Sequence, residues 1–294
     1  TGFSGFGNQA KYPTTFTVLP SYAMEAKIIS KFVKEKFPGQ AVALVAQDDE
    51  FGVDGVNGFA AGSLTLASKT LYPQSSMTDA RAKALVTGLS AIPGKPVVIL
   101  FGTTDVTALI FKAAESLNLV SKFTWIAGSV GGDSNTLLAL GVKTTTIDGA
   151  IAASFFPDAK DTTDEYVKEF SKINAKYNSG VTFDNVVLQG MNSAMLTVQA
   201  LRAAGKNLTR AGLIKAIETK GSTFASAGLA PLNYSATSRV GYNGYWFGQL
   251  NAKGELKPVG GKVTLYTTDS TSATAPVLST YTRKPLPKNG IPTN

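Results

Sequence analysis

Short apolar runs that favour β-structure recur through the first half of the chain. They are residues 41–46, 65–72, 96–101, 123–127 and 150–155. Continuous apolar runs of this length are typical of strands buried on both faces of a sheet. Their starts lie roughly 25 to 30 residues apart, the length of one strand with its following helix. The pattern therefore predicts an α/β fold, with a parallel sheet covered by helices.

Helical patterns occupy much of the remaining chain. They cover the ranges 24–33, 79–89, 106–117, 164–177, 184–204 and 209–220. Residues 244–250 and 261–267 alternate like strands on either side of a turn at 251–254, which predicts a hairpin. The helices after residue 157 have no parallel sheet of their own to cover. The sequence therefore predicts a second compact part that is incomplete.

Composition limits the chemistry of the chain. The 294 residues include no cysteine and no histidine, which excludes disulfides and Ser-His or Cys-His catalysis and leaves little basis for a metal site. The net charge of +8 comes from scattered basic residues, and their densest group, 283–288, lies in a Pro-rich tail. A nucleic-acid binder would need a basic stripe interleaved with aromatic residues. We therefore expect no nucleic-acid partner, no metal and no cofactor. No apolar run reaches the roughly 18 to 20 residues of a membrane-spanning helix.

The positions of the predicted strands indicate which segments could bind a ligand in a parallel sheet. Ligands bind beyond the carboxyl ends of the strands, where helix N-termini present free N–H groups. The segments at these positions are 47–52, 72–76, 102–104, 128–132 and 155–157. They carry small residues, hydroxyl groups and aromatic rings, which suit the binding of a small molecule.

Within these segments, each candidate residue has two interpretations. Phe51, which precedes Gly52, either lays its ring over a ligand or packs it into the next helix. Thr103 and Thr104 either contact a polar ligand group or cap a helix. Ser129 either binds a ligand or permits a tight turn in a Gly-rich loop.

Three acidic residues leave an enzymatic alternative open. Asp48, Asp49 and Glu50 could act as acid and base in a hydrolase or transferase, or hold Mg²⁺. The simpler interpretation is that they are solvated turn residues, favourable at the N-terminus of the next helix.

The stretch AVALVAQDDEFGVDGVNGF, which ends at Phe59, resembles the periplasmic solute-binding proteins of ABC transporters in the Leu/Ile/Val-binding (branched-chain amino acid) family. In that family a buried strand runs into an acidic turn, an aromatic-Gly pair and a helix. Weaker similarities follow in the family's order, and together they extend over essentially the whole chain. They are FTVLP at 16–20, ILFG at 99–102, GMNSA at 190–194, LRAAG at 201–205 and LTRAGLIKAI at 208–217.

The resemblance implies a two-lobe, type I periplasmic-binding-protein (flytrap) fold. Residues 39–156 would form a complete second lobe. Residues 1–38 would be the end of the first lobe with the interlobe helix, and 157–294 its returning part with a C-terminal hairpin and tail. The first lobe would be incomplete, because its opening strands and secretion signal would precede Thr1.

The implied function is non-catalytic: capture of a small molecule and its delivery to an ABC transporter permease. The implied location is periplasmic or extracellular, in association with a membrane. A lipid anchor on the absent N-terminal part is one way in which the protein would be attached. Three alternatives to this function remain. They are a ligand sensor with the same fold, a fragment with a structural role, and the hydrolase or transferase described above.

The resemblance also assigns roles to individual residues. Phe51 stands where the family places an aromatic ring against the ligand, and Thr104 stands at a second contact. Ser129 stands where amino-acid binders have the acidic residue that holds the ammonium group, and Val186 is a candidate apolar contact from the first lobe. A buried ammonium without a counter-charge is costly. We therefore expect the ligand to be a neutral or carboxylated small molecule rather than an α-amino acid. An aromatic molecule is one option within this class.

Overall fold

The computed structural model describes residues 2–287, which form two compact units. Unit 1 comprises residues 2–21, 155–245 and 279–287, and unit 2 comprises residues 22–154 and 246–278. This grouping assigns the helix after residue 21 and residues 246–278 to the unit that holds residues 39–154. The lobe boundaries expected at residues 38 and 156 remain a prediction.

Unit 2 is built on the predicted parallel sheet. Its strands are β1 (Val42–Gln47), β2 (Ser68–Tyr72), β3 (Val97–Phe101), β4 (Thr124–Ala127) and β5 (Ile151–Ser154). They lie in the order β2-β1-β3-β4-β5, and every neighbouring pair is parallel. Every residue of β1 and β3 is buried, as their continuous apolar sequences predict. The α/β class expected from the spacing of these runs is confirmed.

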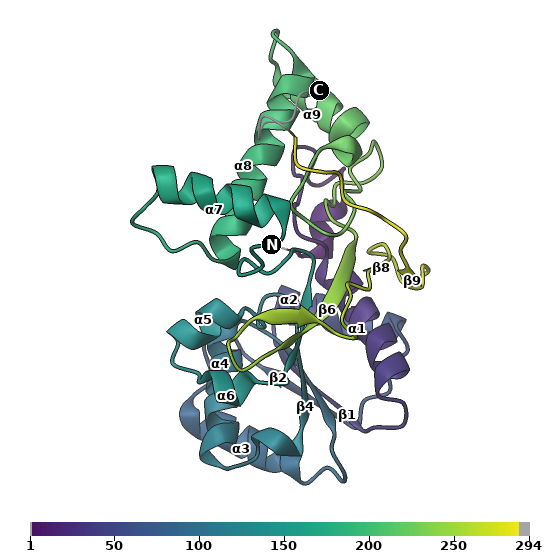
Figure 1. Ribbon diagram of the computed structural model, residues 1–294. Helices are drawn as coiled ribbons and strands as arrows, with labels where there is room; N and C mark the ends of the chain where they lie inside the picture. The colour runs from purple at the N-terminus through teal and green to yellow at the C-terminus, as the bar shows by residue number, and fades with distance from the viewer. Residues whose placement is uncertain (1, 288–294) are drawn as a thin grey trace. The chain divides into compact units, whose positions relative to one another are not determined.

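Helices cover the parallel sheet of unit 2 (Figure 1). They are α1 (Tyr22–Lys36), α2 (Glu50–Ala61), α3 (Asp79–Ser90), α4 (Thr104–Ser116), the short α5 (Ser134–Ala139) and α6 (Thr144–Ile147), and the 3-10 turn η2 (Val120–Lys122). Apolar residues of α3 to α6 form one core with side chains of β1, β3 and β4, whereas α1 and α2 pack together. Asp49, Thr78 and Asp133 cap α2, α3 and α5 with their side chains.

Antiparallel strands extend the sheet beyond β5. They are β6 (Gly244–Leu250), β7 (Leu256–Pro258), β8 (Tyr266–Thr267) and β9 (Val277–Leu278). β6 pairs with β5 and, across the predicted turn, with β7. The strand directly after the turn is 256–258 rather than the predicted 261–267, whereas residues 266–267 form β8, which lies next to β6 in the sheet. The Asn251 side chain accepts hydrogen bonds from the Lys253 and Glu255 amides, so the chain reverses tightly and Leu256 pairs with Leu250.

The regular structure of unit 1 is mainly helical. It contains η1 (Ser4–Gly7), α7 (Glu165–Tyr177), α8 (Asn185–Ala204), α9 (Arg210–Lys220) and η3 (Gly221–Thr223). The side chains of Asp164, Asp184 and Thr209 accept hydrogen bonds from the first turns of the three α-helices, at the boundaries that the sequence predicts. In the described chain, none of the helices is both long and apolar enough to cross a membrane.

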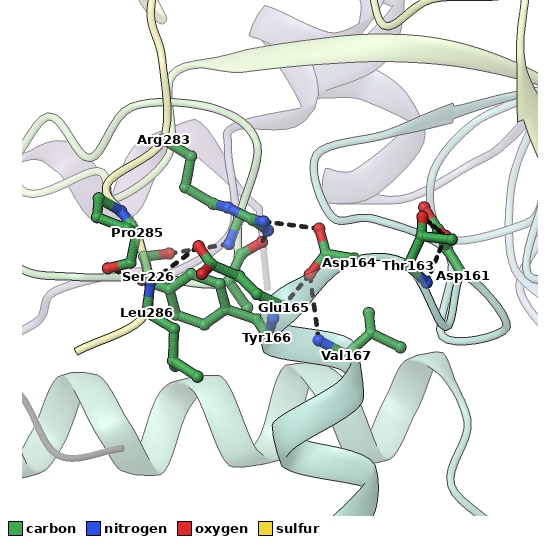
Figure 2. Close-up of polar contacts among 12 residues, drawn as sticks. Asp161, Thr163, Asp164, Glu165, Tyr166, Val167, Ser226, Arg283, Pro285 and Leu286 are labelled. Carbon is green, nitrogen blue, oxygen red and sulfur yellow. Dashed lines mark hydrogen bonds and ion pairs between the residues drawn. The ribbon is translucent and has the colours of Figure 1, made fainter. Parts of the chain in front are cut away.

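The C-terminal tail packs on unit 1 through Arg283. Figure 2 shows this side chain reaching Asp164 at the start of α7, with an Nη2 to Oδ2 distance of 2.7 Å. The guanidinium lies over the Tyr166 ring, 4.5 Å from its centroid, and Nη1 donates to the Ala227 carbonyl oxygen at 2.9 Å. Arg283 is therefore nearly buried and forms an ion pair. This differs from the expectation that the basic residues of 283–288 are exposed to solvent. Lys288, the last residue of the basic group, lies outside the described residues.

Candidate functional site

Four of the five predicted ligand-binding residues lie at the carboxyl edge of the parallel sheet in unit 2. Phe51 follows β1, Thr103 and Thr104 follow β3, and Ser129 follows β4. These three strands are neighbours, so their loops meet at one edge. Val186 lies on α8 of unit 1 and is 62% exposed. The four residues of unit 2 thus form one candidate site, and Val186 remains a separate prediction.

Phe51 belongs to a cluster of aromatic rings. Its ring centroid lies 4.2 Å from that of Tyr22 on α1 and 5.1 Å from that of Phe101 at the end of β3. Phe51 is half-buried, so part of its ring packs in the cluster and part faces solvent. Gly52 allows this position, because a Cβ there would lie 1.6 Å from the Gln47 carbonyl oxygen. Tyr22 was not predicted from the sequence, where its only signal is an aromatic residue at the start of a helix.

Asp49 is the N-cap of α2. Its carboxylate accepts hydrogen bonds from the Phe51 amide at 3.0 Å, from the Gly52 amide at 3.3 Å and from Gln47 Nε2 at 2.5 Å. Asp48 and Glu50 are exposed. The carboxylate of Asp49 therefore has a structural role that needs no acid or base chemistry.

Neither of the two threonines after β3 caps α4 with its side chain. Thr103 occupies the N-cap position of α4, but its side chain makes no capping hydrogen bond. The Thr104 hydroxyl donates to the Val130 carbonyl oxygen at 2.7 Å, which joins the loop after β3 to the loop after β4. The Thr107 hydroxyl donates to the Thr103 carbonyl oxygen at 3.0 Å. The first turn of α4 is therefore left without a side-chain acceptor from its N-cap residue.

A carboxylate does lie at the position of Ser129. The Ser129 amide donates to Oε1 of Glu25, a residue of α1 that is only 1% exposed. The inference that this position lacks an acidic group is therefore wrong, because α1 supplies the acid that the loop does not. Glu25 was not predicted from the sequence, because 104 positions separate it from Ser129 and it is one polar residue of an amphipathic helix.

Comparisons with known proteins agree with this architecture. A protein-family model described as "Periplasmic binding protein" matches residues 1–255. A substrate-binding periplasmic protein from Ralstonia solanacearum superposes with a TM-score of 0.73 and 18% identity, over 88% of this chain and 71% of that one. A comparison with curated proteins found no match.

Two further solved structures have ligands in their descriptions. A branched-chain amino acid ABC transporter protein from Thermus thermophilus with bound valine has a TM-score of 0.70 and 19% identity, over 87% of this chain and 68% of that one. A solute-binding protein of an ABC transporter from Rhodopseudomonas palustris BisB5, in complex with 3,4-dihydroxybenzoic acid, has a TM-score of 0.65 and 18% identity, over 80% and 63%. The predicted type I periplasmic-binding-protein fold is confirmed. Because the family model spans most of its residues, the chain belongs to the periplasmic binding protein family.

Proposed function

We propose that the chain is an extracytoplasmic solute-binding protein that captures a small polar or carboxylated molecule and delivers it to an ABC transporter permease. Family membership supports the general function. The observation that carries the proposal is the edge of unit 2, where an aromatic ring, hydroxyl groups and helix N-termini lie on neighbouring loops. This combination suits the binding of a small ligand by stacking and a few hydrogen bonds.

Each candidate residue has a role in this proposal. Phe51 stacks on the ligand and is held in place by Tyr22 and Phe101. Thr103 and Ser129 contribute polar contacts, and Thr104 holds the two loops together through Val130 and contacts the ligand with its backbone amide. Val186 on α8 stays a separate prediction of an apolar ligand contact within unit 1. The chain acts in the periplasm or outside the cell, in association with a membrane.

The buried carboxylate of Glu25 widens the class of ligands. A ligand ammonium near Ser129 would meet this counter-charge, which removes the electrostatic argument against amino acids. Aliphatic amino acids and small aromatic acids therefore both belong in a first screen. The ligands named for the T. thermophilus and R. palustris structures fall in these two groups.

A thermal-shift screen followed by calorimetry tests the proposal. The probes are L-valine, L-leucine, L-phenylalanine and 3,4-dihydroxybenzoate. We expect at least one to raise Tm with a dose dependence that follows mass action, and to bind with a stoichiometry of one in calorimetry. No shift and no heat with any probe would contradict capture of these two classes. Turnover of a probe by the purified protein would contradict the non-catalytic function.

Delivery to a permease needs its own measurement. Vesicles that contain a candidate ABC transporter permease should take up the identified ligand only when the binding protein is added. Uptake at the same rate without it would favour a sensor.

A further inference from the structure

α4 begins without the side-chain cap that several other helices of this protein have. Side chains cap α2, α3, α7, α8 and α9, whereas the Thr103 hydroxyl makes no capping bond. The Thr104 hydroxyl is engaged with Val130. The first-turn amides of α4 therefore have no capping acceptor from the loop. A helix N-terminus of this kind favours a negatively charged or oxygen acceptor.

A second observation at the same place is the phenol of Tyr72. Tyr72 is the last residue of β2 and is only 5% exposed. Its hydroxyl is buried, and among the described residues no acceptor receives its proton, although the Thr103 backbone lies close enough to interact with the phenol oxygen. The hydroxyl lies directly against Gly102, where a Cβ would stand 1.9 Å from the phenol oxygen. The Tyr72 hydroxyl therefore reaches the short loop that leads into α4.

The phenol is a donor in this setting. Burial is the main cause that raises the pKa of Tyr72 above its ordinary value, and the carboxylates of Asp105 and Asp49 raise it further. A hydrogen-bonding interaction of the phenol oxygen with the Thr103 backbone acts in the other direction and lowers the pKa. The hydroxyl therefore keeps its proton at neutral pH. A buried hydroxyl whose proton has no acceptor is uncommon in proteins and is a reason to look for a ligand or a water molecule.

We propose that the N-terminus of α4 and the Tyr72 hydroxyl form a subsite for a carboxylate of the bound solute. This inference rests on the proposed function and deepens it. The amides of α4 and the phenol are all donors, and a carboxylate offers acceptors to both. Of the two acids near the phenol, Asp49 is already hydrogen-bonded to the first turn of α2, and Asp105 is exposed to solvent. Glu25 would repel a second anionic group at the next loop, so a single carboxylate suits the site.

Calorimetry with matched acids and amides tests the subsite. The pairs are L-leucine with L-leucinamide and 3,4-dihydroxybenzoate with 3,4-dihydroxybenzamide. We expect the wild-type protein to bind the acid of at least one pair about 10-fold more tightly than its amide, and Tyr72→Phe to weaken binding of that acid about 10-fold. The control Tyr177→Phe removes an exposed hydroxyl on α7 and should leave both affinities unchanged.

A stability measurement without ligand tests the same hydroxyl independently. Tyr234 is also buried, but its hydroxyl donates to the Thr17 carbonyl oxygen at 2.8 Å. We expect Tyr234→Phe to lower Tm by several degrees and Tyr72→Phe to leave Tm nearly unchanged or raise it, because the Tyr72 hydroxyl donates its proton to no described protein acceptor. A loss of Tm in Tyr72→Phe equal to that in Tyr234→Phe would show that the protein itself uses the hydroxyl, and would overturn the subsite.

The outcomes separate the two proposals. If the wild type binds a probe but Tyr72→Phe binds it equally well, the subsite is wrong and solute binding stands. If the wild type binds acids and amides equally well, the preference for a carboxylate is wrong. If the wild type binds none of the probes, the proposed function is contradicted for these compounds and the subsite falls with it.

Discussion

Glu25 shows how a single buried charge changes the ligand expected for this protein. A carboxylate withdrawn from water needs hydrogen bonds and positive charge around it. The Ser129 amide donates one hydrogen bond to Oε1 of Glu25. A ligand ammonium beside Ser129 would add a positive charge at the same oxygen. The electrostatic selectivity of the site therefore depends on α1 as well as on the loop after β4.

Replacing this charge should separate ligands by their own charge. Glu25→Gln keeps the size of the side chain and removes its charge, so we expect binding of L-leucine to weaken by about 10-fold or more. Binding of 3,4-dihydroxybenzoate, which has no ammonium, should stay equal or become tighter. Calorimetry on both ligands measures the difference, and Glu169→Gln on the exposed face of α7 is the control. Unchanged affinity for every amino acid that binds would remove Glu25 from the site.

Phe51 offers a test of the apolar part of the site. Phe51→Ala should weaken ligand binding by about 1 to 3 kcal/mol, because it removes the ring surface that would stack on the ligand. Fluorescence titration or calorimetry gives the affinity, and circular dichroism checks the fold. The control Tyr177→Ala removes a ring that is mostly exposed on α7. An affinity in Phe51→Ala equal to that of the control would mean that the ring only packs on Tyr22 and Phe101.

The start of α4 illustrates a competition between stability and binding within one helix. Thr103 has the extended backbone of an N-cap, but its hydroxyl does not accept from the helix. An aspartate at this position would bring an acceptor to the free amides. The same amides are the ones assigned to the ligand carboxylate, so both acceptors cannot use them at once.

Thr103→Asp should therefore have opposite effects on stability and on binding. We expect the free energy of unfolding to rise by about 0.5 to 1 kcal/mol, in the range measured for capping residues, and the affinity for a carboxylate probe to fall. Urea denaturation and calorimetry measure the two quantities. Thr209→Asp is the matched control, because Thr209 already accepts from the Gly212 amide at 3.0 Å and only one cap replaces another. A stabilised variant with unchanged carboxylate affinity would contradict the role of these amides in binding.

The elements that local sequence decides could be predicted, and those that depend on distant partners could not. The helices of unit 1 begin where Asp164, Asp184 and Thr209 cap them, because a cap acts within three residues of its helix. The hairpin partner of β6 was assigned to 261–267 because both segments alternate. The side chain of Asn251 tightens the turn, so 256–258 forms the hairpin with β6, and 266–267 lies next to β6 as β8. The sequence pattern does not show that two later segments neighbour the same strand.

The candidate site was predicted in part for the same reason. The parallel direction of the strands brings Phe51, Thr103 and Ser129 to one edge, and the spacing of the apolar runs predicts that direction; the strand order, which makes their loops neighbours, comes from the structure. Glu25 and Tyr72 were missed because their positions depend on packing. Glu25 comes from a helix that precedes the sheet, and Tyr72 reaches the loop after a strand that is not its neighbour. No periodicity in the sequence reports such contacts.

Unit 1 brings together three separated segments of the chain, and the last of them is the tail that carries Arg283. The guanidinium contacts Asp164, Tyr166 and the Ala227 carbonyl, so one side chain ties the tail to α7 and to the loop before β6. Asp164 also caps α7 with its other carboxylate oxygen. Loss of Arg283 would leave a nearly buried carboxylate without its cation, while the Tyr166 hydroxyl and the Glu165 carboxylate would still hydrogen-bond the tail backbone at Lys284 and Leu286. The tail is therefore expected to be part of the folded unit.

Arg283→Met tests this connection because it keeps much of the side-chain length and removes the charge. We expect the free energy of unfolding to fall by about 2 to 4 kcal/mol, since breaking a buried ion pair at one partner leaves the other uncompensated. Urea denaturation followed by far-UV circular dichroism, which reports on the helices of unit 1, measures the change. Arg210→Met at the exposed start of α9 is the control for loss of a surface arginine.

A double-mutant cycle isolates the ion pair. In the Asp164→Asn background, the added effect of Arg283→Met on the free energy of unfolding should be much smaller, because the pair is already broken. Equal losses in both backgrounds, or a midpoint in Arg283→Met equal to that of Arg210→Met, would mean that the tail does not stabilise unit 1 through this pair.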